Sequence, residues 1–275
     1  ILYYPVDSWF IKTSKISNSM VKLNGSINWK PKSTGEGRFG KWLENVNDWN
    51  LSRSRFWGIP LPIWRTENGN EEICIGSLKE LKKEIKKSIE QGVMSEDIFA
   101  DFESENYAEE NYSKIDLHKN VVDKIVLVSN NGEKMFRETD LIDVWFDSGS
   151  MPYAQWHYPF ENKDLIDKNK FFPADFIAEG VDQTRGWFYT MHVLATALFD
   201  KPAYNSVVCA GHIVDEKGEK MSKSKGNVLV PDEVFDSVGI DAARLQMCAT
   251  SVGDQKRFSV HIVNESILPA LNILF

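Results

Sequence analysis

The stretch that decides the fold runs from Phe176-Ile177-Ala178, through an apolar segment of helical length at 187–199, to Ser206-Val207-Val208-Cys209-Ala210. A strand, a helix and a second strand in close succession are typical of parallel strands joined by a crossover helix. The pattern therefore predicts the α/β class, with a fully buried strand at 206–210. Beyond it, residues 231–238 and 241–249 predict two helices, with Asp241 as N-cap of the second.

Upstream of this stretch the pattern is less regular. Residues 1–75 are rich in Trp, Gly and Pro, which favours irregular chain and short elements packed on a larger body. Ser77 then predicts a helix N-terminus, because Glu80 completes a capping box and an apolar stripe follows. Gly92 is a suitable stop for this helix.

The segment after this helix predicts a surface excursion followed by a hairpin. Residues 95–113 are acidic and polar, which favours a solvated excursion. The alternation at 121–128 predicts a strand, and Asn131-Gly132 is a strong hairpin turn signal. Residues 76–138 are therefore expected to hold the helix that begins after Ser77 and a hairpin.

Composition limits the class of protein. The 275 residues carry a net charge of −8, so any RNA contact has to come from a local basic patch on an acidic body. No apolar run is long enough to cross a bilayer. Cys74, Cys209 and Cys248 are far apart, odd in number and without metal-site spacing, which favours free thiols in a reducing compartment.

The strongest local signal is Lys220-Met221-Ser222-Lys223-Ser224, followed by Lys225-Gly226-Asn227. We refer to residues 220–227 as the Lys loop. Lysine ammonium groups, Ser hydroxyls and Gly amides are suited to phosphate oxygens. The loop also follows a predicted strand, where ligands of open α/β sheets bind. The alternative interpretation is a solvated basic loop.

A second polar cluster ends the strand at 176–180. It consists of Glu179-Gly180-Val181-Asp182-Gln183, whose carboxylates could accept hydrogen bonds from ribose hydroxyls or an ammonium group. Gly180 would permit close approach of a ligand. The structural alternative is that Asp182 caps the following helix.

Two further blocks are ambiguous by themselves. Residues 143–150 (Asp-Val-Trp-Phe-Asp-Ser-Gly-Ser) are typical of an aromatic core strand that ends in a turn. Residues 48–58 alternate Arg and aromatic side chains, including Arg53 and Arg55. Such a pattern suits nucleic-acid binding and cation–π core packing equally well.

Taken together and in this order, the four blocks resemble the isoleucyl-tRNA synthetases, which are class I aminoacyl-tRNA synthetases. The Lys loop is similar to the KMSKS signature of that class. Residues 36–45, 144–149 and 151–155 look like the isoleucine type. A valyl-type synthetase remains an alternative, and so does a non-catalytic RNA-binding module.

The resemblance implies the C-terminal half of a Rossmann-like (HUP-type) parallel-sheet catalytic domain with an inserted connective segment. Residues 1–75 would follow the editing insertion, 76–138 would be the connective insertion, 139–235 the second half of the nucleotide-binding fold, and 236–275 the start of a helical stem-contact and anticodon-binding region. The family's His-containing signature and editing domain are absent from these residues. The chain is therefore expected to begin where the editing insertion ends and to be inactive alone.

The function implied is ATP-dependent ligation of L-isoleucine to tRNA(Ile) through an isoleucyl-adenylate. Mg²⁺ would arrive with ATP, and no metal would be held by the protein. The parent enzyme would be a cytoplasmic monomer without a membrane partner.

The resemblance also implies roles for individual residues. Lys220 and Lys223 would be catalytic, neutralising the triphosphate. Trp145 and Trp187 would be walls of the isoleucine pocket, and Arg53 and Arg55 would contact tRNA. The ATP and adenylate site would comprise Glu179, Gly180, Asp182, Gln183, Gly211, His212, Met221 and Lys223.

Overall fold

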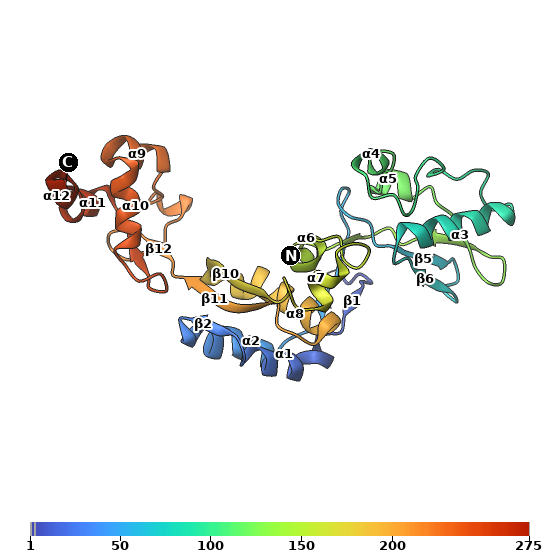
Figure 1. Ribbon diagram of the computed structural model, residues 1–275, viewed down its shortest axis with the longest axis horizontal. Coiled ribbons are helices and arrows are strands. Elements are labelled where there is room, and N and C mark those ends of the chain that lie inside the picture. The colour runs from blue at the N-terminus through green and yellow to red at the C-terminus, as the bar shows by residue number, and fades with distance from the viewer. Residues whose placement is uncertain (1, 3, 275) are drawn as a thin grey trace. The chain divides into compact units, whose positions relative to one another are not determined.

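The computed structural model describes residue 2 and residues 4–274, which form two compact units (Figure 1). Unit 1 consists of Asp48–Asp147 with the residues up to Lys12, and unit 2 consists of Thr13–Asn47 with the residues from Ser148 onward. Each unit is thus built from segments that are distant in the sequence.

Unit 1 contains short strands and three helices within the described residues. They are β1 (Phe10–Ile11), β3 (Trp49–Asn50), β4 (Ser52–Arg53), β5 (Ile63–Thr66), β6 (Glu72–Cys74), α3 (Leu78–Glu90), α4 (Glu109–Tyr112), α5 (Lys119–Val122), β7 (Leu127–Val128), β8 (Lys134–Arg137) and β9 (Leu141–Ile142). Helix α6 (Val144–Ala154) begins in unit 1 and ends in unit 2.

Unit 2 holds the parallel sheet and most of the helices of the described chain. Its elements are η1 (Thr13–Ile16), α1 (Ser17–Asn24), β2 (Asn28–Lys30), the π-helix η2 (Thr34–Phe39), α2 (Gly40–Glu44), α7 (Lys163–Asp167), β10 (Ala174–Gly180), η3 (Val181–Arg185), α8 (Trp187–Phe199), β11 (Tyr204–Ala210), β12 (Ile213–Val214), η4 (Lys223–Lys225), α9 (Pro231–Val238), α10 (Ile240–Cys248), β13 (Lys256–Arg257), α11 (Val260–Ser266) and α12 (Leu268–Leu274).

The predicted parallel sheet is confirmed. Strands β10 and β11 pair in parallel with α8 between them in the chain, and β2 pairs in parallel with the other side of β11. The sequence pattern did not identify β2, which lies in the segment expected to be irregular. The prediction that 206–210 is fully buried was wrong, because exposed or half-buried residues alternate with buried ones along β11.

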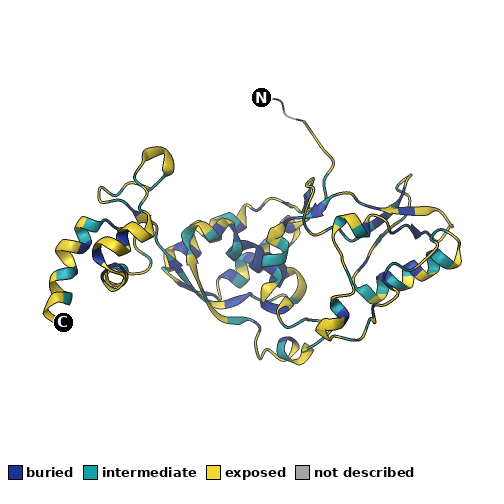
Figure 2. Cartoon of the chain, turned by 90° about the horizontal axis from the view of Figure 1, so that it is seen from above, coloured by how far each residue is buried: buried dark blue, intermediate teal, exposed yellow. Residues whose placement is uncertain are grey.

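Helix α8 is the centre of the unit 2 core. Residues Phe188 to Thr196 are all buried, which colours the middle of the helix dark blue in Figure 2. The segment 187–199 is mostly apolar because a helix that is covered on all sides, as residues 188–196 are, needs no polar face. The hydroxyl of Tyr204, a buried residue of β11, donates to the Phe188 carbonyl at 2.9 Å and ties the helix to the sheet.

Aromatic rings of β2 and η2 pack together and against α8. Trp29 lies 5.0 Å from Phe39 and 5.6 Å from Phe188, measured between ring centroids. Gly35 lies under the Trp29 indole, and a Cβ on Gly35 would be 2.3 Å from that ring. Only glycine therefore fits at residue 35.

Replacing Gly35 with alanine should lower the free energy of unfolding of unit 2 by about 2 kcal/mol, because overpacking a buried site forces backbone shifts. Gly37, in the same π-helix, is the matched control, since a Cβ there would meet nothing within 4 Å. Urea denaturation of the two variants checks the prediction. Equal midpoints for Gly35→Ala and Gly37→Ala would contradict it.

Unit 1 confirms the helix and hairpin. The Ser77 hydroxyl accepts from the Glu80 amide at 3.1 Å, α3 follows, and Gly92 adopts a φ of +70° just beyond its end. Strands β7 and β8 pair antiparallel across the turn at Asn131-Gly132. They join β5 and β6 in one four-stranded sheet of order β6-β5-β8-β7, which therefore links residues on both sides of position 76.

Three local predictions were wrong. Residues 119–122 form helix α5, so only Leu127–Val128 of the expected strand at 121–128 is extended. Residues 144–150 belong to helix α6 and not to a core strand, because the Asp143 carboxylate accepts from the Trp145 amide and starts the helix. Helix α10 begins after Gly239, whose φ is +82°, so Asp241 lies in its first turn and is not the N-cap.

Cys74, Cys209 and Cys248 are free thiols, as predicted, and Cys209 is buried. Across the described residues, no helix combines the length and apolar character needed to cross a membrane.

Candidate active site at the end of the parallel sheet

Strands β10 and β11 end side by side. Glu179 pairs with Cys209 and Gly180 with Ala210, so the polar cluster after β10 and the Gly211-His212 pair after β11 leave the sheet at the same end. The Glu179 and His212 side chains are exposed there. In open α/β sheets, ligands bind outside the carboxyl ends of the strands.

Residues 181–185 after β10 form the 3-10 helix η3, which carries Asp182 and Gln183. The Gln183 side-chain oxygen accepts from the Trp187 amide at 2.9 Å, so Gln183, and not Asp182, satisfies the first amide of α8, whose N-cap is Gly186. The Gln183 amide group also donates to Asp182 Oδ2 at 3.0 Å. A Cβ on Gly180 would lie 2.6 Å from Asp182 Oδ1, so glycine lets the carboxylate approach the strand end.

Trp187 and Trp145, the two tryptophans predicted for the amino-acid pocket, have different surroundings. The Trp187 indole donates to the Ser148 carbonyl at 2.7 Å within unit 2. Gly149 lets this part of α6 lie close to α8, because a Cβ there would be 3.0 Å from Leu194. Trp145 belongs to unit 1, where 40% of the residue is exposed and its amide donates to Asp143 Oδ1 at 3.2 Å.

Gly211 has a packing role that the sequence did not reveal. A Cβ at this position would be 2.1 Å from the Asp254 carbonyl oxygen, and the Gly211 amide donates to the Val252 carbonyl at 2.9 Å. The His212 carbonyl accepts from Lys256 at 2.9 Å, which places β12 beside β13. The backbone of 252–256 therefore fixes the end of β11.

The Lys loop follows a tight turn. Strand β12 leads into Asp215, and a bridge between Val214 and Lys220 closes the turn. The Ser222 hydroxyl accepts from the Lys225 amide and caps η4, and Gly226 ends it with a φ of +67°. Lys220 and Lys223 form none of the ion pairs found in the described part of the chain, so their ammonium groups face solvent.

Asn227 holds the loop together, and it was not among the predicted site residues. Its oxygen accepts from the Ser222 amide at 2.9 Å, and its amide group donates to Asp215 Oδ2 at 2.8 Å. This hydrogen bond from Asn227, together with the one from the Glu219 amide, lowers the pKa of Asp215. The signal in the sequence was the Gly-Asn pair at the end of the lysine run. Lys225 differs from the other two lysines because it pairs with Glu219 at 3.0 Å.

The two arginines of residues 48–58 have different surroundings. Arg53 forms a 2.6 Å ion pair with the buried Asp143, whose same oxygen accepts from the Trp49 indole at 3.0 Å. Arg53 is thus part of the packing of unit 1. Arg55 is exposed beside Phe56 and Trp57, which are 90% and 62% exposed.

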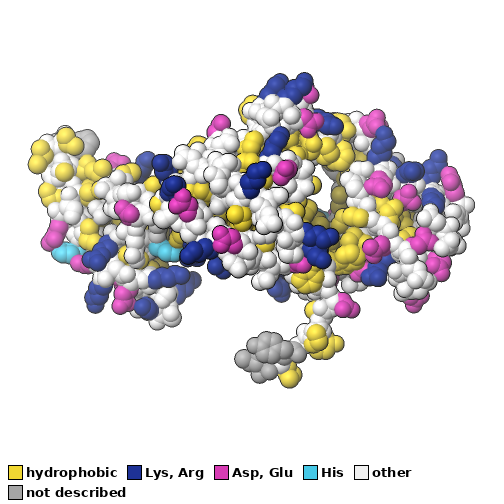
Figure 3. Space-filling model, turned by 90° about the horizontal axis from the view of Figure 1, so that it is seen from below, with side chains coloured by type: hydrophobic (Ala, Val, Ile, Leu, Met, Phe, Trp, Pro, Cys, Tyr) yellow, Lys and Arg dark blue, Asp and Glu magenta, His cyan; other side chains and the backbone are white. Residues whose placement is uncertain are grey.

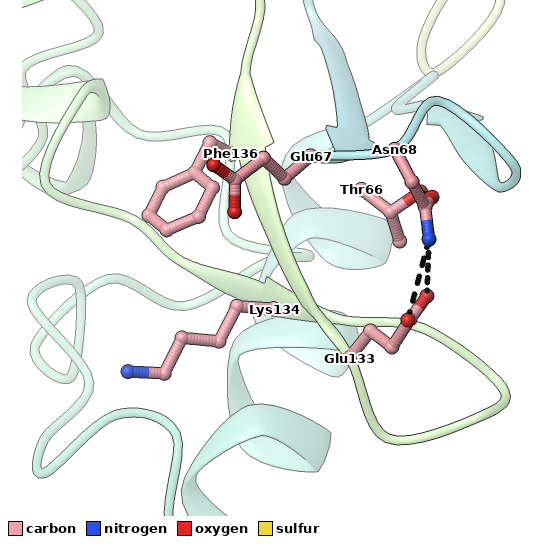
Figure 4. A pocket seen from close by; sticks show the side chains of 6 residues that line it. All are labelled: Thr66, Glu67, Asn68, Glu133, Lys134 and Phe136. Carbon is pink, nitrogen blue, oxygen red and sulfur yellow. Dashed lines mark hydrogen bonds between the residues drawn. The ribbon is translucent and has the colours of Figure 1, made fainter.

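The hollows that the structure shows are lined mainly by polar side chains. One in unit 1 is lined by Thr66, Glu67, Asn68, Glu133, Lys134 and Phe136, and Figure 4 shows Asn68 pointing toward Glu133, which it meets at 3.4 Å. A second, beside the Lys loop, includes Asp215, Lys225 and Asn227. On the face in Figure 3, Lys and Arg side chains gather in several small groups among acidic ones, in keeping with a local anion site on an acidic body.

Within the described residues, no three His, Cys, Asp or Glu side chains are grouped so that they could hold a metal ion.

Comparison of the sequence with known proteins identifies the family of this chain. Residues 2–259 match the family model described as tRNA synthetases class I (I, L, M and V). The isoleucine–tRNA ligase of Bacteroides fragilis is 56% identical over 268 residues, covering 96% of this chain and 24% of the relative. The ligase of Porphyromonas gingivalis is 56% identical, with 96% and 23% covered, and that of Clostridium tetani is 46% identical, with 100% and 24% covered. The chain thus spans about a quarter of the length of these relatives.

Solved structures agree on the fold. Methionyl-tRNA synthetase of Mycobacterium tuberculosis in complex with methionyl-adenylate has a TM-score of 0.54 at 16% identity, covering 97% of this chain and 39% of that one. The LeuRS–tRNA–LeuAMS complex of Agrobacterium radiobacter has a TM-score of 0.53 at 21% identity, covering 82% and 27%. The predicted Rossmann-like class is therefore confirmed, and with the match to residues 2–259 the chain belongs to the class I tRNA synthetases of the I, L, M and V group.

Proposed function

We propose that this chain forms part of the active site of an isoleucine–tRNA ligase, which activates L-isoleucine with ATP and transfers it from isoleucyl-adenylate to tRNA(Ile). The observation that carries the proposal is the common end of β10 and β11. The Glu179 cluster and Gly211-His212 lie together at the carboxyl ends of these two strands, and the Lys loop follows β12 shortly after His212 in the chain.

The phosphate side of the reaction is assigned to the Lys loop. Lys220 and Lys223 carry ammonium groups that are exposed and not paired with any described carboxylate, so they are available to the triphosphate. Charge builds on the phosphates as the isoleucine carboxylate attacks the α-phosphorus and pyrophosphate leaves, and positioned cations stabilise that charge. Met221, half-buried between the lysines, would contact the nucleotide.

The adenylate side is assigned to the strand ends. Glu179, Gly180, Asp182 and Gln183 would hold the ribose and the isoleucine ammonium group. Gly211 and His212 would lie along the adenosine. Trp145 and Trp187 would form walls of the amino-acid pocket. No covalent intermediate on the protein is required, since positioning and electrostatics account for this class of chemistry.

The choice of isoleucine is supported by the three relatives found by sequence, from Bacteroides fragilis, Porphyromonas gingivalis and Clostridium tetani, which are all isoleucine–tRNA ligases. Valine is one methylene smaller, and a hydrophobic pocket discriminates by roughly 10–200-fold on that difference. Isoleucine should therefore be the preferred substrate by such a factor.

We assign 1–75 to the catalytic segment after an editing insertion, 76–138 to a connective insertion, 139–235 to the second half of the nucleotide-binding fold, and 236–275 to the start of the tRNA-stem and anticodon-binding region. Arg55 is the better candidate for a tRNA contact, because Arg53 is engaged by Asp143. Mg²⁺ would come with ATP, and the parent enzyme would be a cytoplasmic monomer.

Isoleucine-dependent exchange of pyrophosphate into ATP tests the function. The 275-residue chain alone should show little exchange, because the family's His-containing signature is not among its residues. Adding the remainder of the full-length polypeptide in trans should restore exchange with isoleucine. Restored exchange with valine at an equal rate would favour the valyl type, and RNA binding without any exchange would favour a non-catalytic module.

A further inference from the structure

We propose that Arg38 and Trp42 are positioning residues that clamp η3, and that they thereby set the geometry of Asp182 and Gln183. This inference rests on the proposed function, because it assigns a purpose to contacts around the adenylate residues. Arg38 lies in η2 and Trp42 in α2, whereas η3 lies more than a hundred residues further along the chain. Both residues lie in the isoleucine-like stretch 36–45, but neither belongs to the four blocks that marked the active site in the sequence.

The first contact of the clamp joins Arg38 to Thr184. Arg38 Nε donates to Thr184 Oγ1 at 2.9 Å. Thr184 is completely buried, and its hydroxyl hydrogen is directed to the Val181 carbonyl at 2.7 Å. The hydroxyl therefore offers Arg38 only a lone pair, which fixes the direction of the contact. Thr184 follows Asp182 and Gln183 directly, so a shift of its backbone would move both.

The second contact joins Trp42 to Arg185. The Arg185 guanidinium carbon lies 3.9 Å from the centroid of the Trp42 ring. Trp42 also meets Tyr189 of α8 edge-on at 5.9 Å between centroids. Its indole N–H is buried and has no hydrogen-bond partner in the described residues, so ring contacts hold this side chain. Thr184 and Arg185, which are adjacent in η3, are thus contacted by Arg38 and Trp42, which lie one turn apart in the continuous helical segment η2–α2.

The clamp itself is rigid because its base is buried. Asn24 donates to the Gly35 carbonyl at 3.0 Å and accepts from the Trp29 indole at 2.8 Å, which ties η2 to α1 and β2. Phe39, also fully buried, packs against Trp29. A π-helix is rare and is frequently found at functional sites, where it redirects side chains. Here it directs Arg38 toward η3 while Phe39 enters the core.

The clamped segment connects directly to the helix behind it. Gln183 accepts from the Trp187 amide and donates to Asp182, so η3 and the start of α8 form one hydrogen-bonded unit. Loss of either clamp contact should let this unit drift. The adenylate site would then be mobile instead of preorganised. Its affinity for the adenylate would fall, because Asp182 and Gln183 would have to become ordered when the ligand binds.

Amide hydrogen exchange of residues 181–187 tests the clamp without any ligand. In the 275-residue chain, Arg38→Ala and Thr184→Val should each accelerate exchange of this segment about tenfold, and the double variant should add little. Trp42→Leu should accelerate it about threefold. Thr184→Ser keeps the hydroxyl group, so this variant should exchange at the wild-type rate. Lys32→Ala is the matched control, because Lys32 makes only an exposed ion pair with Glu36. Unchanged exchange in Arg38→Ala would overturn the clamp.

Binding of isoleucyl sulfamoyl adenosine, a stable adenylate analogue, tests its purpose in a full-length ligase that carries this segment. Arg38→Ala should weaken binding about tenfold and Thr184→Ser should leave it unchanged. If Asp182→Asn weakens binding but Arg38→Ala does not, the positioning role is wrong and the proposed function stands. If neither variant affects binding, the proposed function fails, and the purpose of the clamp fails with it.

Discussion

Replacing Lys223 with alanine should slow adenylate formation by about 10²–10³-fold, while isoleucine binding changes little. The ammonium group is exposed and free of described carboxylates, so it can meet negative charge that develops only as pyrophosphate leaves. An interaction made only in the transition state lowers kcat and leaves ground-state binding alone. Pyrophosphate exchange in the full-length enzyme, at varied isoleucine and ATP, measures both quantities.

Lys225→Ala is the matched control for this experiment. Lys225 is in the same loop, but its ammonium group is held by Glu219 at 3.0 Å, so its removal should cost much less in rate. The assignment of Lys223 would be wrong if its variant kept the maximal rate and only raised the Michaelis constant for isoleucine. Equal losses in both variants would point to a general effect of loop charge.

Unit 2 should lose about 3 kcal/mol of stability through His192 as pH falls from 6.5 to about 4. His192 is fully buried in α8, and its Nε2 lies 2.9 Å from the Met20 carbonyl, to which the neutral ring donates. Burial lowers the pKa of His192 from 6.5 to about 4, against the opposing effect of the hydrogen bond to the Met20 carbonyl. The unfolded chain takes up a proton in this pH window and the folded chain does not, so acid favours unfolding.

His192→Gln isolates this effect from other titrations. Glutamine can still donate to the Met20 carbonyl but does not titrate, so the variant should lack the His192 share of the pH dependence. The measurement is the urea midpoint of unit 2 at several pH values, followed by exchange of α8 amides. Parallel pH profiles for wild type and variant would show that His192 is accessible to protons in the folded state.

The sequence could predict elements whose signals are local. Helix α8 and strands β10 and β11 follow from apolar runs, and α3 follows from the capping box at Ser77 and Glu80. The Lys loop and the Glu179 cluster could be found because their residue order is distinctive, and the parallel register of β10 and β11 then places Glu179 beside the residues before Gly211. These features depend on neighbours within a few residues, which a sequence displays directly.

Contacts between distant segments were decided only by the tertiary structure. Strand β2 is three residues long, too short to carry a periodic signal, and it becomes a strand because β11 offers it hydrogen bonds. The sequence marked 143–150 as a strand from its aromatic residues, yet Asp143, fixed by Arg53 and Trp49, starts a helix there. Gly211 looked like a ligand residue, but the Asp254 carbonyl also requires it.

The same division applies to the candidate site. The sequence by itself determined which chemical groups the candidate site carries, because the lysines, carboxylates and glycines stand in a distinctive order. The tertiary structure alone decided how that chemistry is held, since Arg38 reaches Thr184, Trp42 reaches Arg185 and Asn227 closes the Lys loop. The positions of these side chains depend on contacts between residues that are far apart in the chain. Neither segment alone has a sequence pattern that indicates such a contact.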